Sequence, residues 1–279
     1  MSLASGVRLL AHHAGHDRRR RKGAHLPSGP LRASAGPGSQ GPGFAGEGCG
    51  FQLRTLPPMD APSAATSPAL ALHDVSKRYG RHWALARLTY ALPARRSLLL
   101  TGHNGSGKTT LLRLVATALA PTAGRVEVLG RDAVAHRDAV RQDVALLSHT
   151  SFLYEDLTAH QNLVVLARLL GLASPADAAE TLLTRVGLTR RTQSPVRHFS
   201  AGMRKRLAIA RLLMKTPTLA LLDEPFGELD PAGIQAMEAL IGELKASGTT
   251  VVLATHLIDQ GLALCEERLH LQEGRAVPA

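Results

Sequence analysis

The feature that most limits the possible folds of this chain is a glycine-rich stretch that follows a short apolar run. The run is 97–101, and the stretch matches the pattern G-x-x-x-x-G-K-[ST] with the residues Gly102, His103, Asn104, Gly105, Ser106, Gly107, Lys108, Thr109 and Thr110. The apolar run predicts a buried strand, and the amphipathic segment 108–119 predicts a helix. A strand joined to a helix by such a loop is typical of α/β proteins with a largely parallel sheet.

The same nine residues have the chemistry of an anion site. Their three glycines let consecutive backbone N–H groups turn inward around phosphate oxygens, and the start of the helix adds positive potential. Lys108 supplies a compact cation for the β and γ phosphates of a nucleotide, and the Thr109 hydroxyl suits Mg²⁺. We therefore call residues 102–110 the phosphate loop. The loop predicts a nucleotide site, but by itself it does not specify a reaction.

From residue 69 onward, short apolar runs alternate with longer amphipathic segments, which is the pattern of an α/β domain. Strands are predicted at 69–73, 85–90, 97–101, 125–129, 144–148, 218–222, 250–254 and 268–271. Helices are predicted at 108–119, 159–170, 175–186, 201–214, 231–247 and 257–265. Between about 150 and 198 two helices follow one another without a strand, which indicates a helical insert in the sheet domain.

Residues 1–68 have a different composition from the rest of the chain. They hold 8 Lys or Arg against 3 Asp or Glu, including the run at 18–22, and they contain 19 Gly or Pro without an apolar period. Such a segment buries too little apolar surface to offset its chain entropy, so we expect a disordered basic tail. Two alternatives are a basic arm for acidic phospholipid or nucleic acid, and a gene start placed upstream of a true initiator at Met59.

Composition also excludes several classes of protein. No stretch reaches the roughly 18 to 20 uninterrupted apolar residues of a membrane-spanning helix, so if a membrane is involved, another chain must span it. The two cysteines, Cys49 and Cys265, are too few for a disulfide framework, and neither lies in a paired motif. A reducing cytoplasm is therefore expected.

Two carboxylates follow the apolar run 219–222. The run predicts a strand buried on both faces, and the carboxyl end of such a strand is where an open α/β sheet presents its ligands. We expect Asp223 to hold Mg²⁺ through water and Glu224 to polarise the water that attacks the γ-phosphate. Standing alone, the pair would be explained as the cap of a helix.

The segment Phe199–Met203, with the sequence Phe-Ser-Ala-Gly-Met, opens the predicted helix 201–214. In isolation it would be an ordinary capped helix start. At this position between the phosphate loop and the acid pair, it resembles the signature motif of ABC ATPases, usually written L-S-G-G-Q. We call residues 199–203 the signature segment. Ser200 and Gly202 match the consensus, and these two carry the phosphate contacts in the family.

The resemblance to ABC ATPases covers residues 69–279 and implies further site residues. Tyr79 is similar to the aromatic residue that stacks on adenine, and Asp230 lies in a segment similar to the D-loop that joins two ATP sites. His256 is similar to the switch histidine that senses the γ-phosphate. The implied fold is a P-loop NTPase domain of the ABC type, with a mostly parallel core sheet, an N-terminal antiparallel β subdomain and a helical insert.

One position departs from the family pattern. The family normally has a glutamine after the strand at 144–147, where it reaches Mg²⁺ and the membrane partner, and here His149 stands in that place. Its protonation would make activity sensitive to pH. Together with the segment 154–159 and the Ser-Ala-Gly form of the signature segment, His149 resembles the haem-exporter ATPases of cytochrome c maturation.

The resemblance implies an ATPase that uses ATP and Mg²⁺ and pairs with itself or a homologue. It also implies integral-membrane transporter subunits as partners, and a peripheral position on the cytoplasmic face of the cell membrane. Export of a drug, lipid or polysaccharide is an alternative to haem. An alternative of another class is a soluble ABC ATPase acting on nucleic acid, ribosomes or iron-sulfur assembly. The nucleic-acid and ribosome proteins generally carry two ATPase domains or a long coiled coil, and this sequence shows neither, so no specific nucleic acid is expected.

Overall fold

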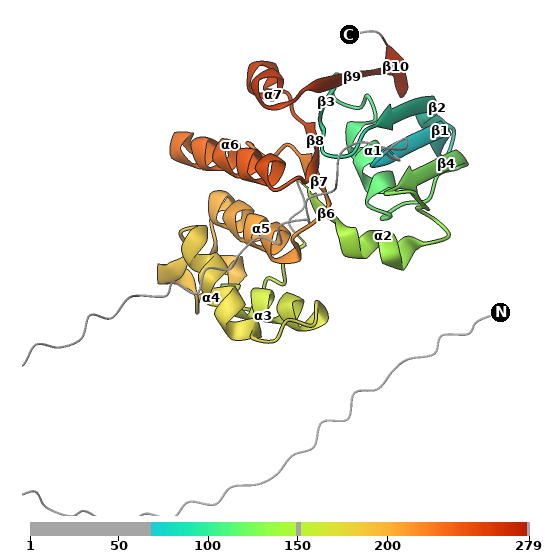
Figure 1. Cartoon of the computed structure of the whole chain (residues 1–279). Coiled ribbons are helices and arrows are strands. Elements are labelled where there is room, and N and C mark those ends of the chain that lie inside the picture. The colour runs from blue at the N-terminus through green and yellow to red at the C-terminus, as the bar shows by residue number, and fades with distance from the viewer. Residues whose placement is uncertain (1–67, 149–151, 278–279) are drawn as a thin grey trace, which may run out of the picture. The chain divides into compact units, whose positions relative to one another are not determined.

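The structure, a computed structural model, describes residues 68–148 and 152–277 (Figure 1). The tail predicted over 1–68 lies outside these residues except for Pro68, and His149 lies outside them as well. None of the helices in the described ranges is long and apolar enough to cross a membrane.

The core is a six-stranded sheet with the order β10-β9-β3-β8-β7-β6. Its strands are β3 (Ser97–Thr101), β6 (Val144–Leu147), β7 (Leu219–Asp223), β8 (Thr250–Ala254), β9 (Glu267–Gln272) and β10 (Arg275–Val277). Five of them run parallel, and only β10 is antiparallel to its neighbour. The prediction of a mostly parallel core sheet is therefore confirmed.

Both faces of this sheet are buried, which explains why its strands are apolar throughout. Leu99 belongs to one hydrophobic cluster, whereas Leu98 and Leu100 belong to the other, because successive side chains of a strand point to opposite faces. The first cluster contains residues of α3 (Ala159–Leu169), α4 (Pro175–Arg185), α5 (Ala201–Lys215) and α6 (Pro231–Ala246). The second contains α1 (Lys108–Val115) and strands of another sheet. Figure 1 shows these two groups on opposite sides of the core strands.

The second sheet is antiparallel and has the order β2-β1-β4-β5. Its strands are β1 (Leu70–Tyr79), β2 (His82–Leu92), β4 (Ala123–Val128) and β5 (Arg131–Asp132). The resemblance implied this N-terminal antiparallel subdomain, and the structure confirms it. The strands β1 and β2 extend further than predicted, because their polar ends still pair at Tyr79 and His82 around a turn at Gly80.

Several elements differ from the prediction. The helix α1 ends at Val115 and not at 119, since Thr117 has a φ of +58°, which a right-handed helix cannot contain. The helix α2 (Arg137–Asp143), in which Val140 is the buried residue, is not predicted from the sequence. Between residues 152 and 198, α3 and α4 follow one another, and two short 3-10 turns precede α5.

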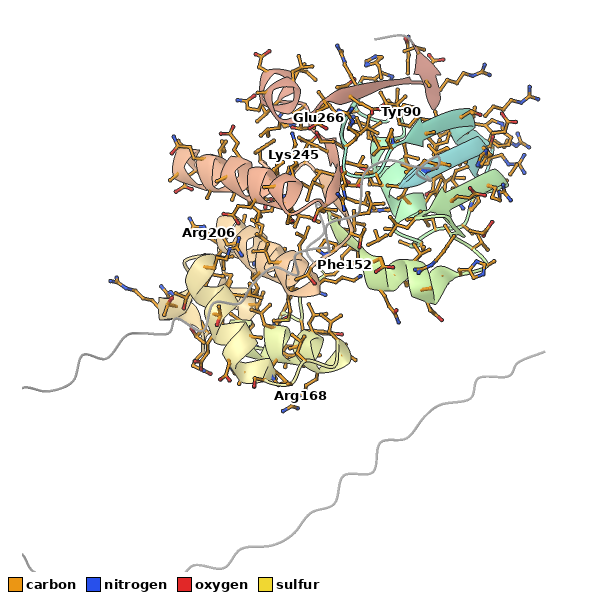
Figure 2. The ribbon with its side chains drawn as sticks, in the orientation of Figure 1. Tyr90, Phe152, Arg168, Arg206, Lys245 and Glu266 are labelled. Carbon is orange, nitrogen blue, oxygen red and sulfur yellow. The ribbon has the colours of Figure 1, made fainter. Side chains whose placement is uncertain are left out.

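Polar contacts hold α6 and the antiparallel sheet against β9. The Lys245 ammonium on α6 donates to the Leu264 carbonyl at 2.6 Å, at the end of α7 (Ile258–Leu264), and lies 3.1 Å from the Glu266 carboxylate. The Tyr90 hydroxyl of β2 donates to Glu267 at 2.7 Å, and burial raises the pKa of this tyrosine (Figure 2). These contacts hold α6 and β2 near the start of β9, the strand that pairs with β3 in the core sheet.

Candidate functional site

Three neighbouring strands of the core sheet end at the same edge. The strand β8 lies between β3 and β7, and all three run parallel, so Thr101, Asp223 and Ala254 end side by side. The phosphate loop follows Thr101, Glu224 follows Asp223, and His256 comes two residues after Ala254. The fold therefore brings three separately predicted motifs to the carboxyl edge of one sheet, where open α/β sheets bind ligands.

The phosphate loop depends on its glycines. Gly102, Gly105 and Gly107 have φ angles of +142°, +83° and +109°, in the region that side chains with a Cβ rarely adopt. Gly107 is also the N-cap of α1, and a Cβ there would lie 2.5 Å from the Ala84 carbonyl oxygen. The loop can take this shape because its glycines allow both the backbone conformation and the close approach of β2.

Lys108 is held by the loop itself. Its ammonium donates to the carbonyl oxygens of Gly102 at 2.7 Å and His103 at 3.0 Å. The His103 ring nitrogen Nδ1 lies 2.7 Å from the Asn104 carbonyl oxygen, so this side chain folds back onto the loop. The lysine cation is therefore placed over the start of α1, where a phosphate group would meet it.

A pocket of about 200 Å³ joins the phosphate loop to the acid pair. Its lining residues are Ala84, Asn104, Gly105, Gly107, Lys108, Thr109, Thr110, Asp223 and Glu224. Lys108, Asp223 and Glu224 thus line one space, and a cation beside two carboxylates suits the phosphates and metal of a nucleotide.

Asp223 is a buried lining residue of this pocket. Burial raises the pKa of the Asp223 carboxyl, and the neighbouring Glu224 charge acts in the same direction, whereas a hydrogen bond with Thr109 and the charge of Lys108 oppose it. A hydroxyl and a carboxylate side by side are oxygen ligands of the kind that Mg²⁺ prefers. In the described part of the chain no cluster of three or more His, Cys, Asp or Glu could hold a metal. The Thr109 hydroxyl and the Asp223 carboxylate therefore suit a metal ion that takes its other ligands from water and phosphate.

Glu224 and His256 contact each other directly. The Glu224 Oε2 atom lies 2.8 Å from His256 Nδ1 and accepts a hydrogen bond from the His256 backbone N–H at 3.3 Å. An ionised carboxylate only accepts, so the ring nitrogen donates when it carries the proton. Glu224 has a φ of +49°, and its own N–H donates to the Ala254 carbonyl at 2.8 Å.

The signature segment and Asp230 lie together in a different pocket of about 370 Å³. Its lining residues are Ser200, Ala201, Gly202, Met203, Arg206, Glu228, Leu229 and Asp230. The Ser200 hydroxyl caps α5 by accepting from the Met203 N–H at 3.3 Å, and the Asp230 carboxylate caps α6 by accepting from the Gly233 N–H at 3.0 Å. This pocket shares no lining residue with the phosphate-loop pocket. Within one chain the predicted residues therefore form two separate groups.

Tyr79 belongs to neither lining. It is exposed at the end of β1, and the Lys77 ammonium lies 5.5 Å from the centre of its ring. Tyr79 pairs with His82 across the hairpin, and Ala84, two residues further along β2, lines the phosphate-loop pocket. The structure therefore places the aromatic ring on the hairpin that packs against the phosphate loop.

Two residues at this site were missed by the sequence analysis. Ala84 lies in no motif, and its position beside the phosphate loop follows only from the packing of β2 on that loop. Lys205 is buried on α5, and its ammonium donates to the Glu224 carbonyl oxygen at 2.8 Å. A signal for Lys205 exists in the sequence, because its helical spacing puts it on the same face as Ala208 and Leu212.

The fold and the phosphate-loop pocket define a P-loop nucleotide-binding domain, with the strand, loop and helix in the required order. The family model described as "ABC transporter" matches residues 85–227. The chain belongs to the ABC transporter family, and its described domain is an ATP-binding ATPase of that family.

Named relatives and solved structures agree with this family. The chain is similar to the Nod factor export ATP-binding protein I of Ralstonia nicotianae, with 32% identity over 77% of this chain and 68% of the relative. It is also similar to the cytochrome c biogenesis ATP-binding export protein CcmA of Nitrosococcus oceani, with 36% identity over 68% of this chain and 86% of the relative. A dimeric ATP-binding cassette in a post-hydrolysis state, bound to ADP and phosphate, has a TM-score of 0.70 and 25% identity, covering 75% of this chain and 97% of that structure.

Proposed function

We propose that this chain is the ATP-hydrolysing subunit of an ABC exporter, with Glu224 as the residue that polarises the attacking water. The observation that carries this proposal is the shared pocket, which Glu224 and Lys108 both line and in which the Glu224 carboxylate lies 2.8 Å from His256 Nδ1. A carboxylate so placed accepts a hydrogen bond from water in line with the γ-phosphate.

The other residues bind and orient the nucleotide. The backbone N–H groups of residues 102–110 surround the phosphates, Lys108 exchanges its carbonyl partners for phosphate oxygens, and Tyr79 stacks on adenine. Thr109 and Asp223 would hold Mg²⁺, which when bound supplies charge neutralisation at the β and γ phosphates. His256 keeps the Glu224 carboxylate in place and lies where it can contact the γ-phosphate.

The complete ATP site requires a second ATPase subunit. The signature segment and Asp230 line a pocket that shares no residue with the phosphate-loop pocket of the same chain. A second subunit would bring Ser200, Gly202 and Asp230 to the ATP held by the first. The similar cassette solved as a dimer supports this arrangement.

A groove beside the helical insert suits a membrane-spanning partner. It has a volume of about 310 Å³, and its lining includes Gln142, Leu146, Phe152, Leu166 and Leu170. Phe152 is 62% exposed and Leu170 is 36% exposed, so two large apolar side chains lie open to solvent in one groove (Figure 2 labels Phe152). Docking of a transporter subunit would cover it and hold the chain at the cytoplasmic face of the cell membrane.

The cargo is proposed from relatives alone. The similarity to the cytochrome c biogenesis export protein supports haem export, and the similarity to the Nod factor export protein supports another cargo, with a drug, lipid or polysaccharide as the second candidate. Gentle isolation of the chain from its native membrane, with identification of the subunits that accompany it, tests both. We expect recovery with membranes and release by alkaline or high-salt washing. Salt-sensitive association with ribosomes or RNA would instead indicate the non-transport class of ABC ATPase.

A further inference from the structure

Lys205 is a buried cation on the helix that begins at the signature segment. It is 6% exposed and lies three residues after Gly202, near the start of α5. Its ammonium donates to the backbone carbonyl of Glu224 at 2.8 Å. Burial lowers the pKa of Lys205, while the carboxylates of Glu228, Asp223 and Glu224 favour its charged form.

The Glu224 backbone needs such a contact. A φ of +49° is costly for a residue with a Cβ and persists only where the surroundings hold it. On one side the Glu224 N–H donates to Ala254 of β8 at 2.8 Å. On the other side the Glu224 carbonyl accepts from Lys205 at 2.8 Å and from the Gly227 N–H at a longer 3.3 Å.

These contacts decide where the Glu224 side chain points. With the backbone fixed at the N–H and at the carbonyl, the Cα–Cβ bond has one direction, and from it the carboxylate reaches His256 Nδ1 at 2.8 Å. Loss of the Lys205 contact would leave the carbonyl with a single weak donor and free the backbone to relax toward a right-handed conformation. The carboxylate would then move away from the attacking water.

We propose that Lys205 is a positioning residue for hydrolysis, which holds the Glu224 backbone from the signature helix and so aims the Glu224 carboxylate. This inference rests on the proposed function, because it takes Glu224 as the group that polarises water. It also makes the direction of the carboxylate depend on α5, the helix whose first turn would contact the ATP of the other subunit.

The test compares two lysines on the same helix. Lys205→Met keeps a long unbranched side chain but removes the ammonium. Lys215→Met is the matched control, because the Lys215 ammonium also donates to a backbone carbonyl, that of Val144, and burial also lowers its pKa. We expect Lys205→Met to lower kcat about 10- to 100-fold with KM for ATP changed less than about twofold, and Lys215→Met to change neither.

A second readout separates positioning from damage to the signature segment. In a Glu224→Gln background, Lys205→Met should still form the ATP-dependent dimer, since the signature segment stays intact. Loss of that dimer would overturn the inference and assign Lys205 a structural role. Lys205→Leu, which is apolar and cannot donate a hydrogen bond to the Glu224 carbonyl, covers the case in which the methionine variant does not fold, and it should also lower kcat.

Wild-type kcat in either folded Lys205 variant would overturn the inference. If the wild-type chain hydrolyses ATP and Glu224→Gln does not, such a result contradicts the role of Lys205 alone. If Glu224→Gln retains wild-type turnover, the proposed function itself is wrong. The two failures are therefore distinguishable.

Discussion

At the scale of single residues, Gly102 shows how closely the phosphate loop is packed. A Cβ at this position would lie 2.2 Å from the Leu271 carbonyl oxygen and 2.5 Å from Ser106 Oγ, and the φ of +142° is itself unfavourable for a side chain. We expect Gly102→Ala to displace the loop and weaken ATP binding at least about tenfold. Nucleotide titration measures this loss. The control is Gly242→Ala in α6, where a Cβ has open space, and which should stabilise the fold by about 0.5 to 1 kcal/mol.

Lys108 should discriminate nucleotides by the number of their phosphates. Its ammonium lies at the start of α1 with two carbonyl partners that a phosphate can replace. Because charged hydrogen bonds to phosphate contribute about 1.5 to 3 kcal/mol each, Lys108→Ala should weaken ATP binding about 10- to 100-fold. Affinity for AMP, which lacks the β and γ phosphates, should change much less. Equal losses for ATP and AMP would contradict the assigned position of the lysine.

At the scale of elements, the two helices of the insert begin in different ways. The Thr158 hydroxyl accepts from the Gln161 N–H at 3.1 Å, and the Gln161 side chain accepts from the Thr158 N–H at 2.9 Å, which forms a complete capping box at the start of α3. Ser174, the N-cap of α4, makes no side-chain cap hydrogen bond. We expect Thr158→Ala to lower the free energy of unfolding by about 1 kcal/mol and Ser174→Ala to have little effect. Thermal or denaturant unfolding of both variants measures the difference, and equal effects would contradict the assignment.

The elements that could be predicted from sequence are those whose burial leaves a pattern. The strands β3, β7 and β8 are buried on both faces, so their runs are continuous in apolar residues. The helix α2 left no such pattern, because Val140 is its buried residue. The early end of α1 depends on tertiary contacts at Thr117, whose hydroxyl accepts from Arg141 Nε at 2.9 Å. A contact between segments this far apart cannot be read from local periodicity.

At the candidate site, too, some features follow from local sequence patterns and others depend on contacts between distant segments. Asp223, Glu224 and His256 follow apolar strands, and the order of a parallel sheet brings such strand ends together, so their proximity could be expected. The contact between Lys205 and the Glu224 carbonyl could not, because it depends on how α5 packs against the core sheet and on a backbone conformation at Glu224 that no motif encodes. The motifs therefore predict that Asp223, Glu224 and His256 lie close together, whereas the contact that holds the Glu224 backbone depends on the packing of α5.

At the scale of the whole molecule, the two separate pockets predict that nucleotide state controls association. Glu224→Gln keeps the shape of the side chain but removes the carboxylate that polarises water. We expect it to bind ATP, to lower kcat at least about 100-fold, and to accumulate as a dimer in which each ATP lies between a phosphate loop and a signature segment. Light scattering during size-exclusion chromatography with Mg²⁺ and ATP measures the dimer.

Two controls make this prediction specific to the bound triphosphate. The same variant with ADP should remain monomeric, because the γ-phosphate that bridges the two chains is missing. Glu224→Gln combined with Lys108→Ala should also remain monomeric at ATP concentrations that trap the single variant, since the phosphate loop then holds ATP weakly. A monomer under saturating ATP in the single variant would mean that the signature segment completes no second site. The pocket around Ser200 and Gly202 would then need another occupant, and the chain would act on ATP alone.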